Sequence, residues 1–209
     1  MADARIVDTP PPVVLASASV ARRSMLSAAG LTFDVVPARI DEDAVKSAMV
    51  AVDPYVSPAM IAARLAQEKA LAVARNNVGR LVIGSDQVLV FENTIFSKVE
   101  TLDEARAVLK KLRGRAHELV SAVALARDGE VLWHHEEAAR LTMRDFSDAF
   151  LAGYLEDAGE VILQCVGCYE LEAAGVQLFE KIEGDYFTVL GLPLLALLSA
   201  LRTQGALIA

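Results

Sequence analysis

Hydrophobic positions in this chain follow two spacings, one typical of buried strands and one typical of amphipathic helices. Short continuous apolar runs predict buried strands at residues 13–16 and 81–83, and Phe33 to Val36 is expected to form a further strand that ends at Pro37. Apolar positions at helical spacing, together with capping residues, predict five helices, at residues 20–29, 58–76, 101–112, 147–155 and 194–201. Helices that alternate with strands in this way are typical of an α/β protein.

Two further pairs of apolar segments are separated by turn residues, and each pair predicts an antiparallel hairpin. The turn residues are Glu92-Asn93 in the first pair and Asp128-Gly129 in the second. Hairpins among alternating helices and strands favour a mixed sheet over a purely parallel one. Further strands are expected at residues 161–169 and 187–190.

The length and composition fit one folded domain. The chain has 209 residues, 54% of them apolar and 23% charged, which supplies enough core material for a globular protein. Residues 1–12 hold two acids, one arginine and three consecutive prolines. We therefore expect a flexible tail at residues 1–12 and a single domain at residues 13–209.

The charge balance narrows the choice of ligand. Lys and Arg number 20 and Asp and Glu number 28, so the formal net charge is −8. An acidic chain does not attract the phosphate backbone of a nucleic acid, and we expect no nucleic-acid polymer as a partner. A single small anion can still bind in a local cationic pocket.

No segment has the features of a targeting sequence or a membrane span. The most apolar stretch, residues 186–201, is interrupted by Gly191 and Pro193 and is shorter than the ~20 residues that cross a bilayer. The two cysteines, Cys165 and Cys168, cannot form a disulfide scaffold and lack the further ligands of a zinc site. We expect packing cysteines in a cytoplasmic protein.

The first candidate for chemistry is the turn between the strand at 13–16 and the helix at 20–29. Its small residues let an anion approach the N–H groups at the start of the helix. Arg22 and Arg23 lie in the first helical turn, where the helix dipole disfavours cations. A bound phosphate group would explain them, but the segment alone fits equally well two arginines that solvate a surface helix.

The second candidate is Gly84-Ser85-Asp86-Gln87, which follows the buried strand at 81–83. Ligand sites in α/β folds gather at such strand ends, where an Asp can hold a divalent metal or accept a proton from water. Taken alone, the pattern favours an Asp that closes a turn. Three more charged residues carry no clear signal on their own: Glu42, Lys69 and Lys98.

Taken together and in order, these segments resemble the Maf family of nucleotide pyrophosphatases over about residues 13–201. The matching motifs are Leu15-Ala16-Ser17-Ala18-Ser19 with Arg22-Arg23, Ile40-Asp41-Glu42, Arg64-Leu65-Ala66 with Lys69-Ala70, Gly84-Ser85-Asp86, Lys98, Gly184-Asp185-Tyr186 and Gly191-Leu192-Pro193-Leu194. Each motif is weak alone, but their order and separations make the resemblance specific.

The resemblance implies an α/β fold with an elongated mixed sheet, flanking helices and two lobes around a cleft, similar to inosine triphosphate pyrophosphatases. It also implies a homodimer that hydrolyses a nucleoside triphosphate to the monophosphate and pyrophosphate with Mg²⁺ or Mn²⁺. Asp86 matches the family's catalytic acid or base, and Glu42 and Asp86 are the expected metal ligands. The expected substrate-binding residues are Ser17, Arg22, Arg23, Glu42, Lys69 and Lys98.

Within the family, the sequence is similar to the branch that acts on N7-methylguanosine triphosphate. That branch carries Gly-Ser-Asp-Gln, as here, and a Glu near Leu-Phe-Glu, which Glu172 matches. A carboxylate can accept hydrogen bonds from the N1–H and amino group of guanine, and N7-methylation makes the ring cationic. The resemblance implies that Gln87 and Glu172 read the base and that Ala21 affects selectivity.

The sequence also departs from the family pattern, and other functions stay open. The departures are Val20 and Ala21 after the second serine, Ser97 and Val99 around Lys98, and Glu170 where this branch tends to have Lys. One alternative is an enzyme of the same chemistry that prefers dTTP or UTP. A second is a nucleotide-binding regulator of septation or division with weak activity, and a third is a scaffold without a ligand.

Overall fold

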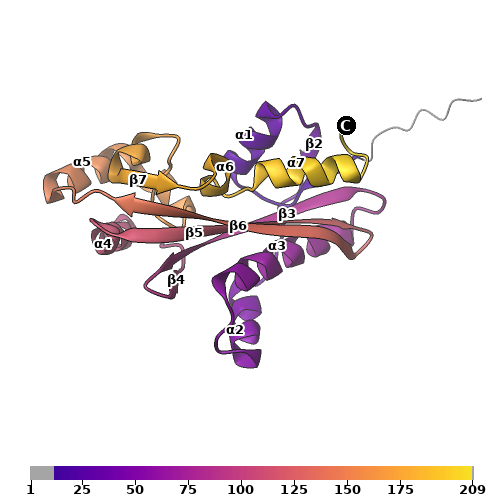
Figure 1. The fold of residues 1–209 in the computed structure, drawn as a ribbon, viewed down its shortest axis with the longest axis horizontal. Helices are drawn as coiled ribbons and strands as arrows, with labels where there is room; N and C mark the ends of the chain where they lie inside the picture. The colour runs from indigo at the N-terminus through magenta and orange to yellow at the C-terminus, as the bar shows by residue number, and fades with distance from the viewer. Residues whose placement is uncertain (1–11, 209) are drawn as a thin grey trace, which may run out of the picture.

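A seven-stranded mixed sheet runs along the molecule in the computed structural model, which describes residues 12–208 (Figure 1). Strands β2, β1 and β3 are parallel, and β5, β6 and β7 extend the sheet in antiparallel pairs in the order β2-β1-β3-β5-β6-β7. A short strand, β4, pairs with β3 alone. The strands are β1 Val13–Leu15, β2 Phe33–Val35, β3 Leu81–Phe91, β4 Thr94–Phe96, β5 Ala116–Arg127, β6 Glu130–Met143 and β7 Phe179–Glu183.

Most helices begin at a residue whose side chain caps the first turn. Ser19, Ser57 and Ser147 each accept a hydrogen bond from a backbone N–H in the first turn of a helix, and Thr101 and Glu104 form a capping box. The helices are α1 Val20–Ala28, α2 Glu42–Val52, α3 Pro58–Ala74, α4 Leu102–Leu112, α5 Asp148–Ala158, α6 Tyr186–Val189 and α7 Leu194–Thr203, with 3₁₀ helices η1 Gly159–Gln164 and η2 Ala174–Leu178.

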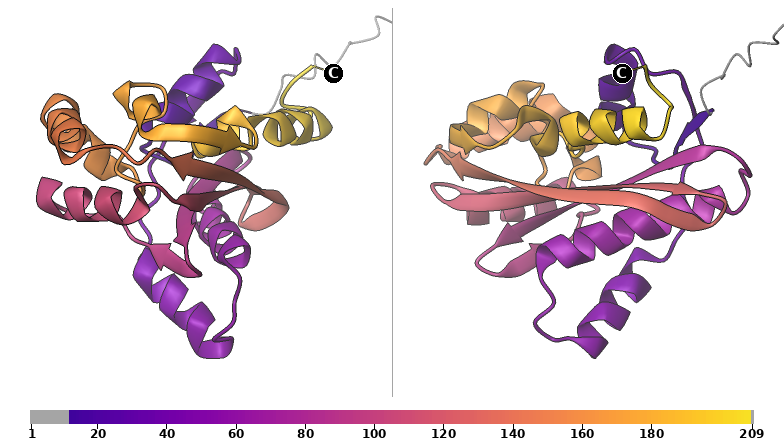
Figure 2. Two further views of the ribbon diagram at one scale, coloured as in Figure 1. Left: turned by 60° about the vertical axis from the view of Figure 1, so that its left-hand side comes forward. Right: turned by 45° about the vertical axis from the view of Figure 1, so that its right-hand side comes forward.

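The hydrophobic core is divided into three clusters. One lies between the sheet and α3, and another packs α1 and α7 on the opposite face of the sheet (Figure 2). The third joins α4, α5 and η1 to the far ends of β5 and β6. The sheet is therefore covered differently at its two ends, which gives the elongated, two-lobed α/β arrangement with a mixed sheet that the sequence predicts.

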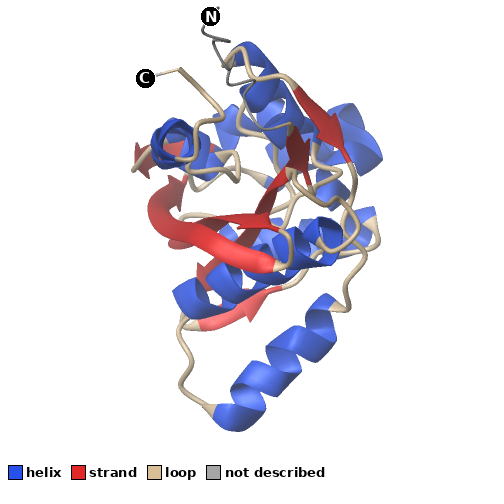
Figure 3. Ribbon diagram, turned by 90° about the vertical axis from the view of Figure 1, so that its right-hand side faces the viewer, coloured by secondary structure: helices blue, strands red, loops and turns tan. Residues whose placement is uncertain are grey.

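Helix α2 projects from the body of the molecule (Figure 3). It contains no buried residue, although Val45 and Met49 pack at the margin of the cluster around α3. Asp41 caps its first turn by accepting a hydrogen bond from the N–H of Ala44. One side of α2 is thus held at the margin of the α3 cluster by Val45 and Met49, and its other side faces solvent.

Strand β3 exchanges partners along one of its edges, and this exchange leaves a gap in the sheet. Residues 81–83 pair with β1 and residues 89–91 pair with β4, whereas the opposite edge pairs with β5 almost throughout. Between these two partners, no strand within residues 12–208 pairs with residues 84–88 on the first edge. The strand segment that borders this gap is Gly84-Ser85-Asp86-Gln87-Val88.

Several predicted elements differ in the structure. The segment Gly84–Asp86 is not a turn after a strand but the middle of β3. The strand expected at 161–169 is η1 and the turns after it, and the strand expected at 187–190 is mostly α6. Of the predicted tail at residues 1–12, residues 1–11 lie outside the described residues. Among residues 12–208, no helix is both long and apolar enough to span a membrane.

Candidate active site

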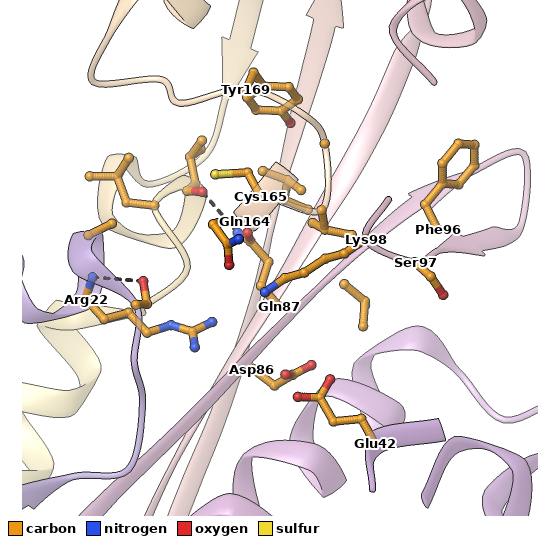
Figure 4. A pocket seen from close by; sticks show the side chains of 18 of the residues that line it. Arg22, Glu42, Asp86, Gln87, Phe96, Ser97, Lys98, Gln164, Cys165 and Tyr169 are labelled. Carbon is orange, nitrogen blue, oxygen red and sulfur yellow. Dashed lines mark hydrogen bonds between the residues drawn. The ribbon is translucent and has the colours of Figure 1, made fainter. Parts of the chain in front are cut away.

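A cleft of about 530 Å³ opens where β3 lacks a partner strand. Its walls come from the β1–α1 turn, α2, α3, the loop after β4, and the segment between η1 and η2. Figure 4 shows Arg22 approaching from one side and Glu42 and Asp86 facing each other at the other. Residues far apart in the sequence therefore meet in one cavity.

The pleat of β3 determines which side chains reach this cavity. Alternate residues point to opposite faces of a sheet. Gly84, Asp86 and Val88 share the face covered by α3, whereas Ser85 and Gln87 point to the face that carries α6. Because this part of the strand has an unpaired edge, Asp86 and Gln87 both line the cleft.

Arg22 closes the unpaired edge of β3. The N–H of Ala16 donates to the carbonyl of Ile83, and two residues further along Arg22 Nη1 donates to the carbonyl of Ser85 at 2.9 Å. Arg22 Nε also donates to the carbonyl of Gly191 at 2.8 Å. Within residues 12–208, Nη2 makes no hydrogen bond, so its two N–H groups can reach a ligand in the cleft.

Two residues shape the surroundings of this guanidinium. Ser17 Oγ accepts a hydrogen bond from Arg22 Nη1 at 3.2 Å. Gly191 has a φ of +93°, and a Cβ there would lie 3.3 Å from Arg22 Nη2. Burial lowers the pKa of Arg22, while the nearby charges of Asp86 and Glu42 act in the opposite direction. Arg22 stays cationic because its ordinary pKa lies far above neutral pH.

Lys69 joins two carboxylates from different elements. Its Nζ on α3 lies 2.6 Å from Asp86 Oδ1 on β3 and 2.7 Å from Glu42 Oε1 on α2. The side chains of Lys69 and Asp86 are only 13% and 8% exposed, so solvent screens this pair weakly, whereas Glu42 is 43% exposed. The three residues form a charged group at one end of the cleft.

The pKa of Glu42 reflects the cations around it. Burial acts to raise this pKa, but the hydrogen bond from Lys69 and the charges of Lys69, Lys46 and Lys98 together bring it below its usual value. Glu42 is therefore ionised at neutral pH and ready to interact with cations.

The side-chain amide of Gln87 has a fixed orientation. Its Nε2 donates to Ser121 Oγ at 3.0 Å and to the backbone carbonyls of Thr188 and Val189 at 3.2 and 3.0 Å. Ser121 Oγ in turn donates to the carbonyl of Thr188 at 2.7 Å. Since the nitrogen faces these acceptors, the carbonyl oxygen is the part of the amide that can accept a hydrogen bond from a ligand.

The far end of the cleft combines aromatic, thiol and acidic groups. Tyr169 and Cys165 line it, and Lys98 extends into the cavity from the loop after β4 (Figure 4). Glu170 and Glu172 belong to the same wall. Burial, with the added charge of Glu172, raises the pKa of Glu170.

Burial also raises the pKa of both cysteine thiols. The pKa of Cys165 is raised to about 11 and that of Cys168 to about 12. Both cysteines are free, and Cys168 is part of the core around α5. Thiols with such pKa values are protonated at neutral pH, which agrees with the predicted packing role.

Eight of the ten predicted site residues line this one cleft: Ala21, Arg22, Glu42, Lys69, Asp86, Gln87, Lys98 and Glu172. Ser17 is buried behind Arg22 and touches the site through that side chain. Arg23 is exposed on α1 and is not part of the lining, because the next helical position points about 100° away from Arg22. The structure thus places Arg23 outside the cleft.

Other lining residues were not predicted. Lys46, Gln164, Cys165 and Tyr169 also line the cleft. Lys46 had a sequence signal, since it follows Glu42 by four residues, but that spacing is informative only if residues 42–52 are helical. The wall residues after η1 had no signal, because their position depends on an irregular segment.

The fold and the cleft define a class of protein, an α/β protein with a cationic and acidic cleft at a break in a mixed sheet. The model of the Maf-like protein family matches residues 12–204. The chain belongs to the Maf family.

Three relatives are similar over almost the whole chain. A nucleoside triphosphate pyrophosphatase of Caulobacter vibrioides is 53% identical over 94% of this chain and 97% of its own length. A nucleoside triphosphate pyrophosphatase of Paramagnetospirillum magneticum is 51% identical over 93% of this chain and 100% of its own length. A 7-methyl-GTP pyrophosphatase of Rhizobium meliloti is 48% identical over 94% of this chain and 98% of its own length.

Proposed function

We propose that this protein hydrolyses a nucleoside triphosphate to the monophosphate and pyrophosphate, with N7-methyl-GTP as its preferred substrate. The main observation in support of this proposal is that Arg22, Lys69, Lys98 and Asp86 line one cleft of a Maf-family chain. The relatives named nucleoside triphosphate pyrophosphatase and 7-methyl-GTP pyrophosphatase support the same reaction and substrate.

The cations of the cleft bind the triphosphate. Arg22 offers the free N–H groups of Nη2, and Lys98 extends its ammonium group into the cavity. Fixed positive charge near the transferred group stabilises the charge that builds up on the phosphate oxygens in the transition state. Lys69 holds the carboxylates of Glu42 and Asp86 in place before substrate binds.

Asp86 acts as the general base. Its carboxylate lies within the cleft beside the bound triphosphate and accepts a proton from a water molecule. The oxygen of that water forms a bond to the α-phosphorus, and the bond from this phosphorus to the oxygen that bridges the α- and β-phosphates breaks. Pyrophosphate leaves with the electron pair of that bond.

Glu42 and Asp86 are the residues that would hold Mg²⁺ or Mn²⁺. Both carboxylates lie within 2.7 Å of one ammonium nitrogen, so this part of the cleft is built to hold positive charge. Among the described residues, no group of three or more Asp, Glu, His or Cys side chains is arranged as a metal site. One or two carboxylates completed by substrate phosphates is a donor set that Mg²⁺ commonly takes. A bound metal would neutralise charge on the phosphates.

The base occupies the far end of the cleft. The carbonyl oxygen of Gln87 and the carboxylate of Glu172 both accept hydrogen bonds, which matches the N1–H and amino donors of guanine. The small side chain of Ala21 leaves room beside Arg22. A cationic N7-methylated ring is favoured further by the acidic side chains of Glu170 and Glu172.

The substitution Asp86→Asn tests the proposed reaction. We expect pyrophosphate release to fall by about 10²–10⁴-fold, because the amide cannot accept the proton. The circular dichroism spectrum should stay close to that of the wild type, since the side chain keeps its shape. Asp103→Asn, on the exposed first turn of α4, is the control. Turnover by Asp86→Asn at the wild-type rate would show that Asp86 is not the base.

A nucleotide panel with Mg²⁺ and Mn²⁺ separates the alternatives. Preference for dTTP or UTP would favour the related specificity. Tight nucleotide binding without pyrophosphate release from any nucleotide would favour a regulator of septation or division. A cytoplasmic location and a homodimer are predictions that rest on the family resemblance.

A further inference from the structure

The cations of the cleft differ in how far the protein already uses them. Four line it: Arg22, Lys46, Lys69 and Lys98. Arg22 donates from Nε and Nη1 to backbone and serine oxygens, and Lys69 lies within 2.7 Å of two carboxylates. Most of the hydrogen-bonding capacity of these two residues is therefore engaged before any ligand binds.

Lys46 is much less engaged. Its only ion pair within residues 12–208 is with Asp43, at a long 3.4 Å, and the Asp43 side chain is 88% exposed. An exposed pair of this kind contributes about 0–1 kcal/mol. The Lys46 side chain itself is only 25% exposed, and Lys46 belongs to the lining of the cleft.

The geometry of α2 fixes where Lys46 lies. It follows Glu42 by four residues, and side chains at this spacing share one face of a helix. Glu42 is tied to Lys69, and so this face of α2 is directed to the charged end of the cleft. The charges of Lys46 and Lys98 both act to lower the pKa of Glu42, so both lysines lie within electrostatic range of this carboxylate.

We propose that Lys46 is a further substrate-binding residue, which binds the two terminal phosphates of the triphosphate together with Lys98. These phosphates leave as pyrophosphate and carry most of the negative charge of the substrate. Lys46 and Lys98 reach the cleft from α2 and from the loop after β4, so they can bind the leaving group from two sides. This proposal rests on the proposed function and adds the residue that recognises the leaving group.

The test compares ligands that contain the two terminal phosphates with one that lacks them. Binding of guanosine monophosphate, pyrophosphate and a triphosphate analogue with a non-hydrolysable α–β link is measured by calorimetry for wild type and Lys46→Gln. We expect about 10-fold weaker binding of the triphosphate analogue and of pyrophosphate to the variant, and a change of less than about 2-fold for the monophosphate. Lys46→Arg should restore most of the lost affinity.

Two control variants separate this role from a structural one. Lys110 on α4 is also 3.4 Å from an exposed Asp, Asp148, but lies outside the cleft, and so Lys110→Gln should bind all three ligands as the wild type does. Asp43→Asn removes the carboxylate that pairs with Lys46 and leaves the positive charge of Lys46 in place. Its affinity for the triphosphate analogue should equal or exceed that of the wild type.

Three results would overturn the role of Lys46. They are unchanged affinities in Lys46→Gln, an equal loss for the monophosphate and the triphosphate, and a loss in Asp43→Asn that matches that in Lys46→Gln. If the wild type releases no pyrophosphate from any nucleotide, the proposed function fails instead, whatever the behaviour of Lys46→Gln.

Discussion

Arg22 serves the fold and the cleft at once. Its guanidinium donates to the carbonyls of Ser85 and Gly191, so it satisfies backbone acceptors that are not paired by a strand in the described part of the chain. The same side chain presents Nη2 to the cleft. The family motif in the sequence identifies Arg22 as a candidate. The sequence does not predict that the carbonyls of Ser85 and Gly191 accept its hydrogen bonds, because only the folded chain brings these residues beside Arg22.

His117 is a buried residue of β5 that does not line the cleft itself. It contacts Tyr169, which does line the cleft. Its Nε2 is 2.8 Å from Tyr169 Oη, and burial lowers its pKa to about 4. Tyr169 packs edge to face against Phe179 at 4.8 Å between ring centroids. A neutral imidazole is therefore part of the support for the wall of the cleft.

We predict that His117 makes the protein sensitive to acid. Between pH 6.5 and pH 4 an unfolded chain binds a proton at His117 that the folded chain does not, so the free energy of unfolding falls as the pH is lowered through this range. The expected loss between pH 7 and pH 4 is up to about 3 kcal/mol. It is measured by urea unfolding at a series of pH values.

The matched variants are His117→Gln, which keeps a hydrogen-bonding side chain without the titration, and His135→Gln, whose side chain is 41% exposed. The pH dependence in this range should become shallower in the first and stay as in the wild type in the second. Identical pH profiles for His117→Gln and wild type would contradict the prediction.

At the scale of elements, the packing of β3 against α3 depends on Gly84. A Cβ at this position would lie 2.1 Å from the carbonyl oxygen of Ala66 and 2.6 Å from the N–H nitrogen of Ala70. Both contacts are with backbone, which cannot rotate away as a side chain can. The absence of a side chain lets α3 lie directly on the strand and brings Lys69 close to Asp86.

We predict that Gly84→Ala destabilises the protein by about 1–3 kcal/mol, because α3 must move away from β3. Turnover should fall as well, since the movement separates Lys69 from Asp86. The control is Gly153→Ala on α5, where nothing lies within 4 Å of the added Cβ, and which should be neutral or stabilising by up to about 1 kcal/mol. Thermal or urea unfolding of both variants measures these two changes in the free energy of unfolding.

The elements that could be predicted are those with a strong local pattern. Helix α4, with its capping box, and the hairpin of β5 and β6 around Asp128-Gly129 are confirmed. The strand expected at 187–190 is wrong because Asp185 caps a short helix there, accepting a hydrogen bond from the N–H of Thr188. A short, mostly apolar segment such as residues 187–190 suits a buried strand and a buried helical turn equally well.

The position of Asp86 shows a different limit. Gly84, Ser85 and Asp86 are typical of a turn, yet they continue β3, because β5 pairs with them on one edge and α3 packs on their face. These constraints come from residues outside the local sequence, such as Ala70 on α3 and Ala122 opposite Asp86 on β5. The family motif selected Asp86 as a candidate, and Asp86 lines the cleft, whereas local sequence preference gave the wrong backbone conformation.

At the scale of the whole molecule, the cleft is a product of topology. Parallel pairing ends at residue 83 of β3 and antiparallel pairing with β4 begins at residue 89. No local pattern in the sequence specifies where these partners change. The meeting of Arg22, Lys69 and Asp86 was predicted from the order of motifs, and the break between β1 and β4 is the physical reason that they share one cavity.

Lys69 also links α2 to the rest of the molecule, because α2 has no buried residue and Glu42 is bound to Lys69. Without this ammonium group, the carboxylates of Glu42 and Asp86 would face each other unpaired. We predict that Lys69→Met lowers the free energy of unfolding at pH 7 by about 1–3 kcal/mol, less than for a fully buried pair because Glu42 is partly solvated. Hydrogen exchange should become faster in the first turns of α2 and stay unchanged in α7.

The effect of Lys69→Met on the free energy of unfolding should depend on pH, which a simple loss of packing would not cause. The pKa of Glu42 is lowered in the folded protein, so the stabilisation from its ion pair is present above pH 4.5 and is lost as the pH falls through the folded pKa. The difference between Lys69→Met and wild type should therefore shrink on acidification. Lys181→Met is the control, because Lys181 pairs with Glu183 at a similar 2.7 Å on the exposed surface and its loss should cost less than about 1 kcal/mol. A difference that stays constant from pH 7 to pH 3 would show that Lys69 acts through packing and not through its charge.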